Sequence, residues 1–322
     1  MTVRVAPAML AALLCAGCSI NQMAVNKLGN ALAGSGTTFA ADNDPELIEA
    51  AVPFSLKLME SLLDASPRHE GLLLAAAGGF TKYSYGFEQQ EADRLEEQDM
   101  ARASLARTRA RNLYFRARDY GLRGLEVRYA GFGQRLRTDA RGAVRGTRVG
   151  DVPLLYWTAA AWGAAIAISK EMPSVVADQL IVEALIDRAL ELDSTYDAGA
   201  IHGFLISYEM ARQGAPGDPV ERSLAHYQRA VALSNGMLAS PFLSLAEAVS
   251  IPKQNRRQFD SLITRALAVD PEARPEWRLA NIIMQRRARW LQGRADELFL
   301  EQAALPGRRQ AWLTNLTGME ER

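Results

Sequence analysis

The sequence predicts an all-α protein that contains a helical repeat. From Asp44 onward, apolar residues recur at three- and four-residue steps, which is the pattern of amphipathic helices. No run in the chain shows the alternation of a half-buried strand. Hydrophobic residues make up 48% of the 322 residues and charged residues 23%, a composition that indicates a globular chain and excludes a disordered one.

Residues 1–17 are predicted to be a lipoprotein signal peptide. Arg4 precedes an apolar run, and small residues precede Cys18, which is the order of parts in a secretory signal. The segment ends like the bacterial lipobox, with the residues Leu14-Cys15-Ala16-Gly17-Cys18. This resemblance implies that Cys18 is lipidated and becomes the new N-terminus. The alternative is an ordinary signal peptide with two incidental cysteines.

The lipobox resemblance implies a folded part in the periplasm of a Gram-negative bacterium, held to a membrane by acyl chains. Ser19, and not Asp, follows the cysteine, which by resemblance to enteric lipoproteins favours the outer membrane over the inner one. Residues 18–41 are rich in small residues and are predicted to be a lipidated tether, with a short helix around Ala24 to Leu32. Residues 42–322 are predicted to form a single helical domain.

Two long helices are expected at the start of this domain. Asp44 is suited to cap a helix and Pro45 to occupy its first position, so the first helix begins there. A second helix is expected from about His69 through Tyr85, with an extension to Arg109.

An exposed loop and a buried helix are expected next. Five glycines between positions 131 and 150 predict the loop. The run from Val152 to Ser169 carries no charge, which is near the lower length limit of a transmembrane helix. Asp151 and Pro153 form a helix start, however, and Ala and Gly supply most of the run. We therefore interpret it as the buried central helix of the domain.

The C-terminal part repeats one segment, most clearly within residues 174–300. The three copies run from Arg188 to Asp193, from Arg229 to Ser234 and from Arg265 to Asp270. Their spacing is close to the roughly 34-residue period of tetratricopeptide repeats, in which each unit is a pair of helices. The second helices are expected over Tyr196–Arg212, Met237–Ser250 and Ala273–Phe299. Stacking of the pairs predicts a tetratricopeptide-like helical bundle or solenoid.

Charge is distributed unevenly in the middle of the chain. Residues 102–148 hold thirteen arginines and three acids, whereas residues 86–99 hold six acids and one arginine. Either these segments neutralise each other on a solvated surface, or the basic one is a docking face for an acidic partner or a funnel for an anionic solute. Over the whole chain 37 basic and 37 acidic residues balance, so nucleic acid is not an expected partner.

Residues that carry catalysis are scarce. Both cysteines lie within the first eighteen positions, and the three histidines, His69, His202 and His226, do not have metal-binding spacing. No Gly-x-Ser-x-Gly elbow occurs, and Gly29 and Gly34 are not followed by the lysine of a phosphate-binding loop. We therefore expect no enzyme, no cofactor and no metal site.

Five stretches of the chain carry a family likeness. They are residues 36–47, 53–63, 80–93, 156–166 and 278–291, which read GTTFAADNDPEL, PFSLKLMESLL, FTKYSYGFEQQEAD, YWTAAAWGAAI and RLANIIMQRRARWL. These stretches resemble the TatT family, lipoproteins associated with TRAP (tripartite ATP-independent periplasmic) transporters. The resemblance implies a helical periplasmic lipoprotein that assembles into a homo-oligomer, such as a trimer. It also implies binding to the transporter's solute-binding protein and a cleft for a small hydrophobic or anionic molecule.

The cleft residues are expected where polar or aromatic groups interrupt apolar helix faces. They are Tyr83, Tyr156, Trp157, His202, Tyr208, Gln285 and Arg286. The leading interpretation is a non-enzymatic adaptor that passes a small organic solute to or from the TRAP solute-binding protein. The alternative is a tetratricopeptide scaffold lipoprotein that binds peptide segments during cell-envelope assembly.

Overall fold

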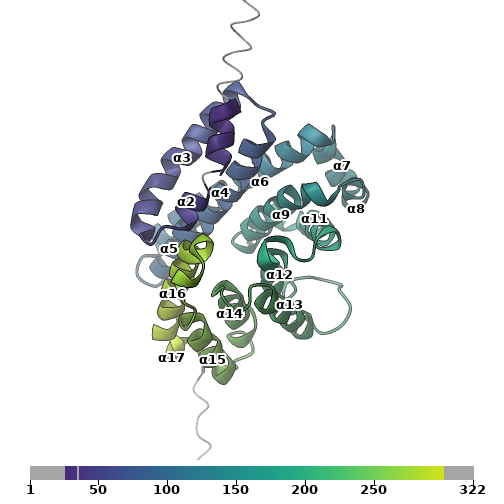
Figure 1. Cartoon of the computed structure of the whole chain (residues 1–322). Coiled ribbons are helices and arrows are strands. Elements are labelled where there is room, and N and C mark those ends of the chain that lie inside the picture. Colours follow the sequence, from purple (N-terminus) through teal and green to yellow (C-terminus); the bar gives the residue numbers. More distant parts are fainter. Residues whose placement is uncertain (1–25, 35, 301–322) are drawn as a thin grey trace, which may run out of the picture.

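The computed structural model describes residues 26–34 and 36–300 (Figure 1). These residues form helices joined by turns and contain no strand, which confirms the all-α fold class. After a helix over residues 26–34, the first half contains α2 (Gly36–Ala40), α3 (Pro45–Ala65), α4 (Glu70–Tyr83), the π-helix η1 (Ser84–Gln89), α5 (Gln90–Leu95), α6 (Met100–Arg128), α7 (Phe132–Thr138) and α8 (Ala140–Val144).

The second half begins with the buried helix and continues as helix pairs. Its elements are η2 (Val149–Asp151), α9 (Val152–Ala167), α10 (Pro173–Val176), α11 (Gln179–Leu192), α12 (Tyr196–Tyr208), α13 (Pro219–Leu233), α14 (Ser240–Leu245), the π-helix η3 (Ala246–Ser250), α15 (Arg256–Leu267), η4 (Pro271–Ala273), η5 (Pro275–Trp277), α16 (Arg278–Gly293) and α17 (Ala295–Leu298). The predicted signal peptide and Cys18 lie outside the described residues.

The first two long helices start at polar caps. The Asp44 carboxylate accepts a hydrogen bond from the Leu47 amide at 3.0 Å, so α3 begins where the sequence predicts. α4 follows His69 and continues through η1 and α5 to Leu95. The predicted extension to Arg109 is wrong, because the chain turns after Leu95 and the Asp99 carboxylate caps the new helix α6.

α6 and α9 pack closely at the centre of the first half. A Cβ atom at Gly121 would meet Thr158, and one at Gly124 would meet Leu154, so these glycines allow the two backbones to approach. Trp162 of α9 is 1% exposed. The uncharged run is therefore the buried central helix that the sequence predicts. None of the helices in the described part is both long and apolar enough to cross a membrane.

Residues 131–150 are not the exposed loop that their glycines predict. They contain α7, α8 and the short helix η2. Gly131 adopts a left-handed conformation, with φ 73°, at the turn between α6 and α7. Phe132 and Leu136, one helical turn apart, are 0% and 2% exposed. Burial of this pair stabilises a helix that glycine content alone does not indicate.

Helix pairs follow in the part of the chain that contains the repeated segments. They are α11 with α12, α13 with α14 and η3, and α15 with α16. The predicted second helices start or end inside their expected bounds: α12 ends at Tyr208, α14 starts at Ser240 and α16 starts at Arg278. Pro275 lies just before α16 and interrupts the helix expected from Ala273. The assignment of these pairs to tetratricopeptide repeats stays a prediction.

The last long helix returns to the first ones and closes the array of helices on itself (Figure 1). Arg278 Nη1 donates to the Ala41 carbonyl oxygen at 2.7 Å. Arg287 lies between Asp93 of α5 and Glu247 of η3, with nitrogen–oxygen distances of 2.9 and 2.6 Å. The closure joins residues of the predicted tether and of the first helices to the C-terminal part.

Candidate functional site

A lysine lies against aromatic rings beside α9. Lys82 of α4 has its Nζ 5.0 Å from the centroid of the Trp157 ring. Tyr156 packs edge-on against Trp157, with ring centroids 4.9 Å apart. Tyr196 of α12 approaches Tyr156 at 5.5 Å, and the neighbouring Asp197 carboxylate acts electrostatically on Lys82. We call these five residues the Lys82 recess.

The Lys82 side chain is exposed to solvent and yet surrounded by protein. Desolvation lowers the pKa of its ammonium group, and the Asp197 carboxylate opposes this shift. Desolvation also raises the pKa of Tyr196 to about 12. Protein atoms near the ammonium group therefore disfavour its charged form even though water can reach the side chain. Among the residues that the structure describes, no carboxylate forms an ion pair with Lys82.

The backbone beside the recess is strained. Asp197, Ala198 and Gly199 have φ values of 45°, 52° and 92°, so three consecutive residues are left-handed. This conformation costs non-glycine residues roughly 1–2 kcal/mol each. A Cβ atom at Gly199 would lie 3.2 Å from the Ala230 Cα atom, so the turn packs α12 tightly against α13. The same turn determines where Tyr196 and Asp197 enter the recess.

Two of the seven predicted cleft residues, Tyr156 and Trp157, lie in the Lys82 recess. Tyr83 follows Lys82 in sequence but lies in the hydrophobic core, where it is 7% exposed and its ring is 5.4 Å from that of Phe87. Desolvation raises the pKa of Tyr83 to about 12. The Tyr208 hydroxyl donates to the Gln179 carbonyl oxygen at 3.2 Å, which connects α12 to α11.

Gln285 and Arg286 hold helices together. The Gln285 amide is buried and donates to carbonyl oxygens at the end of α15, the nearest being that of Val269 at 2.6 Å. Arg286 forms a two-pronged ion pair with Glu46 at the start of α3, with 3.0 Å between Nη2 and Oε2. Both side chains therefore take part in contacts between helices.

His202, the remaining predicted cleft residue, pairs with His226. Their Nδ1 atoms lie 2.8 Å apart, so one ring donates a hydrogen bond to the other. Desolvation lowers the pKa of His202 to about 4, and the nearby His226 adds to this shift. His202 Nε2 is buried and has no hydrogen-bond partner among the residues that the structure describes. Within the described part of the chain, no three His, Cys, Asp or Glu side chains are arranged to hold a metal ion.

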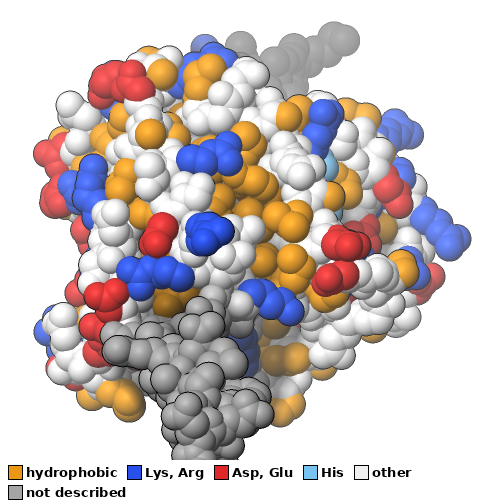
Figure 2. Space-filling view, turned by 90° about the horizontal axis from the view of Figure 1, so that it is seen from below, with side chains coloured by type: hydrophobic (Ala, Val, Ile, Leu, Met, Phe, Trp, Pro, Cys, Tyr) orange, Lys and Arg blue, Asp and Glu red, His pale blue; other side chains and the backbone are white. Residues whose placement is uncertain are grey.

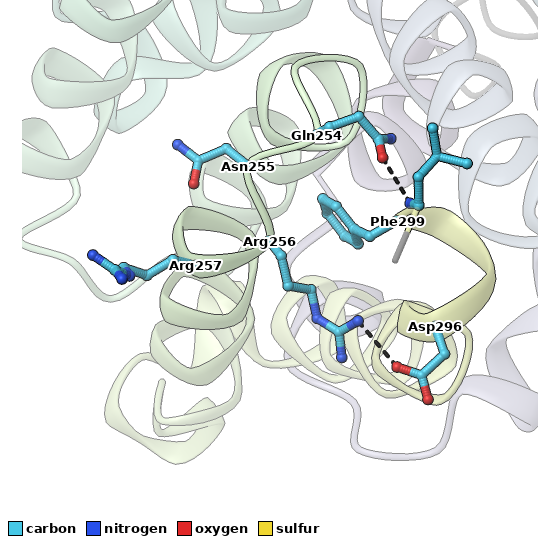
Figure 3. A pocket seen from close by; sticks show the side chains of 7 residues that line it. Gln254, Asn255, Arg256, Arg257, Asp296 and Phe299 are labelled. Carbon is cyan, nitrogen blue, oxygen red and sulfur yellow. Dashed lines mark hydrogen bonds and ion pairs between the residues drawn. The ribbon is translucent and has the colours of Figure 1, made fainter. Parts of the chain in front are cut away.

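A polar pocket between α15 and α17 lies outside the recess (Figure 3). Two of its lining contacts are internal: Arg256 pairs with Asp296 at 3.0 Å, and Gln254 Oε1 accepts a hydrogen bond from the Leu300 amide at 2.8 Å. A second pocket lies beside α10 and α11 around the exposed Leu180. Neither pocket contains a residue of the Lys82 recess.

The arginine-rich segment forms ion pairs at its start and has exposed arginines towards its end. In α6, Arg107 pairs with Glu96 and Arg109 with Glu88, so the acidic segment neutralises the start of this helix. The arginines of α7 and α8 are exposed. Figure 2 shows one face of the molecule, on which hydrophobic side chains gather in the middle and basic and acidic ones are interspersed around them.

Comparison with known proteins places most of the fold in one family. Residues 41–299 match the family model described as TRAP transporter T-component. The chain belongs to this family. A protein of Treponema pallidum (strain Nichols), described as uncharacterized, is 31% identical over 311 residues, which cover 90% of the T-component chain and 95% of the relative. Membership confirms the resemblance seen in the sequence, and it indicates an accessory role in transport for a periplasmic or membrane-associated protein.

Sequence reasoning missed three residues of the recess, Lys82, Tyr196 and Asp197. Lys82 is the one charged residue between Glu70 and Glu88, and an isolated charge on an apolar helix is the signal that points to it. No such signal marks Tyr196 and Asp197, because the turn that places them is left-handed at residues other than glycine.

Proposed function

We propose that this T-component binds a small organic anion with an apolar part in the Lys82 recess. The observation that carries the proposal is the exposed but desolvated Lys82 ammonium, which has no ion-pair partner in the described part of the chain. An anionic ligand gains more from a cation that is partly surrounded by protein atoms than from one on an open surface, because solvent screens it less. The rings of Tyr156 and Trp157 supply the apolar contact.

The proposed site is tested by titrating the full chain with 8-anilinonaphthalene-1-sulfonate, an aromatic anion. Lys82→Met is expected to weaken its binding by about ten- to a hundredfold, because a charge-assisted contact contributes roughly 1.5–3 kcal/mol. Trp157→Ala should also weaken binding while the helical circular dichroism signal remains. Lys57→Met, which removes an exposed lysine from α3, is the matched control. Equal affinities for Lys82→Met and Lys57→Met contradict the proposal.

We further propose that the protein is a non-enzymatic adaptor that passes this solute to or from the solute-binding protein of a TRAP transporter. Family membership supports this role. A cross-linked pull-down of the tagged protein from its own cells, with mass spectrometry of proteins and small molecules, tests it. Recovery of a periplasmic solute-binding protein is expected. Recovery of envelope-assembly proteins without a solute-binding protein contradicts the adaptor and supports the scaffold.

Self-association and membrane anchoring complete the proposal. Leu47 and Phe54, two turns apart on α3, are 56% and 73% exposed and offer an apolar face for homo-oligomer contacts. Acylation at Cys18 anchors the chain to the outer or the inner membrane, with the fold in the periplasm. Metabolic labelling with palmitate should mark the wild-type protein and not Cys18→Ser.

A further inference from the structure

One end of the molecule gathers the start of the described chain and the turns that follow α3 and α6. The Ser66 hydroxyl, in the turn after α3, donates to Asn26 Oδ1 at 2.9 Å. In the same turn, Arg68 Nη2 donates to the Val127 carbonyl oxygen near the end of α6 at 3.2 Å. The twenty-five residues before Asn26 therefore join the fold at the end where α6 leads into α7 and α8.

α7 and α8 expose a cluster of arginines at this end. The side chains of Arg135, Arg137, Arg141 and Arg145 are exposed. Arg135 donates to the Ala130 carbonyl oxygen. In the part of the chain that the structure covers, no carboxylate forms an ion pair with Arg137, Arg141 or Arg145. We call these four arginines the α7–α8 basic surface.

The acids next to this surface are engaged by the backbone. Asp139 Oδ1 accepts a hydrogen bond from the Gly142 amide at 2.9 Å, and Glu126 Oε2 accepts one from the Gly133 amide at 3.2 Å. The arginines outnumber these two carboxylates, so the surface carries net positive charge. Val149, which follows α8 and is 59% exposed, adds an apolar side chain to it.

We propose that the α7–α8 basic surface docks on an anionic phospholipid bilayer. Guanidinium groups bind phosphate oxygens through two parallel hydrogen bonds, and the exposed Val149 suits the boundary between headgroups and acyl chains. A bilayer is favoured over an acidic protein because the chain before Asn26 contains the predicted signal peptide and lipid anchor, which bring this end of the fold to a membrane. Docking fixes the orientation of the helical array on the bilayer.

Vesicle flotation of a chain that lacks the lipid anchor measures how much this surface contributes to membrane binding. The chain from Ser19 onward keeps every described residue, and its circular dichroism is compared with that of the full chain. We expect it to bind vesicles of phosphatidylcholine mixed with phosphatidylglycerol and not vesicles of phosphatidylcholine alone. The triple variant Arg137→Gln, Arg141→Gln, Arg145→Gln should bind about a hundredfold more weakly, since each basic residue near an anionic surface contributes roughly a factor of five. Added salt should also weaken binding.

The matched control replaces three exposed arginines elsewhere, Arg229→Gln, Arg257→Gln and Arg289→Gln, and should bind as wild type. Hydrogen exchange of the full chain reconstituted in the two kinds of vesicle should show slower exchange of residues 132–145 only with phosphatidylglycerol. Equal binding to both vesicles, or equal losses in the two triple variants, overturns the proposal. Vesicle binding that survives in the Arg137 triple variant, together with loss of an acidic protein from its pull-down, assigns the surface to a protein partner and also overturns it.

Discussion

Replacing Arg287 with leucine is expected to weaken the closure between α16 and the rest of the helices. The Arg287 side chain is 10% exposed and contacts Asp93 at 2.9 Å and Glu247 at 2.6 Å. Leucine preserves apolar contact with neighbours such as Trp290 but leaves two carboxylates without their cation. The perturbation is therefore electrostatic more than steric.

The expected loss of stability follows from the burial of Arg287, Asp93 and Glu247. Removing one partner of a buried ion pair costs roughly 3–5 kcal/mol, because the remaining charge stays desolvated. Asp93 and Glu247 are 22% and 26% exposed, so water relieves part of this cost and the lower end, about 3 kcal/mol, is expected. For a domain of this size, such a loss corresponds to a decrease in Tm of about 6–12 °C.

Urea unfolding followed by circular dichroism, with calorimetry for Tm, measures the effect of Arg287→Leu. The neighbouring Arg286→Leu is the control, because Arg286 is 44% exposed and its ion pair with Glu46 is open to solvent, so little change is expected. In the Asp93→Asn background, the loss caused by Arg287→Leu should be smaller. Equal stabilities of Arg286→Leu and Arg287→Leu would refute the argument that burial makes this ion pair important.

Three further predictions concern pH, packing and self-association. The pKa of His202 in the folded state is about 4, below its ordinary value of 6.5. Between these two pH values the unfolded state binds more protons than the folded state. The urea concentration at the midpoint of unfolding should therefore decrease as the pH is lowered from 6.5 to 4. The double variant His202→Gln, His226→Gln should lose this dependence on pH. If its urea midpoint still changes with pH as in the wild type, these histidines are not the cause. Gly121→Ala should destabilise by about 1–3 kcal/mol in thermal melts, because its Cβ would lie 2.2 Å from Thr158 Oγ1, whereas Gly203→Ala, with open space around it, should not. Phe54→Asp should convert the proposed homo-oligomer to monomers in light scattering, and Met100→Asp, at an equally exposed position on α6, should leave it intact.

The sequence predicts a helix boundary correctly where residues within the same turn of the chain determine it. Asp44 and Pro45 mark the start of α3 because a cap and a proline act within one turn. The uncharged run of α9 predicts burial because the helix has apolar residues on all of its faces and no charged face for solvent. Residues 131–150 were misinterpreted because burial of Phe132 depends on α9 and α11 being nearby, and glycine content says nothing about that packing.

The recess and the closure could not be predicted because they join positions that are distant in sequence. Apolar periodicity shows which face of a helix is buried, but not which helix covers it. Lys82 meets Trp157 only after α4 packs on α9, and Glu46 pairs with a residue 240 positions away, Arg286. The sequence did indicate Tyr156 and Trp157, since aromatic groups in an alanine-rich helix are visible without the fold.

The strained turn at Asp197 and Ala198 supports a binding role for the Lys82 recess. Two non-glycine residues are left-handed there, at a cost of roughly 1–2 kcal/mol each. The turn places Asp197 within electrostatic reach of Lys82. Because backbone strain of this kind gathers at ligand sites, where the surrounding structure maintains it, its position beside Lys82 and aromatic rings favours the recess over the polar pocket of Figure 3 as the proposed solute site.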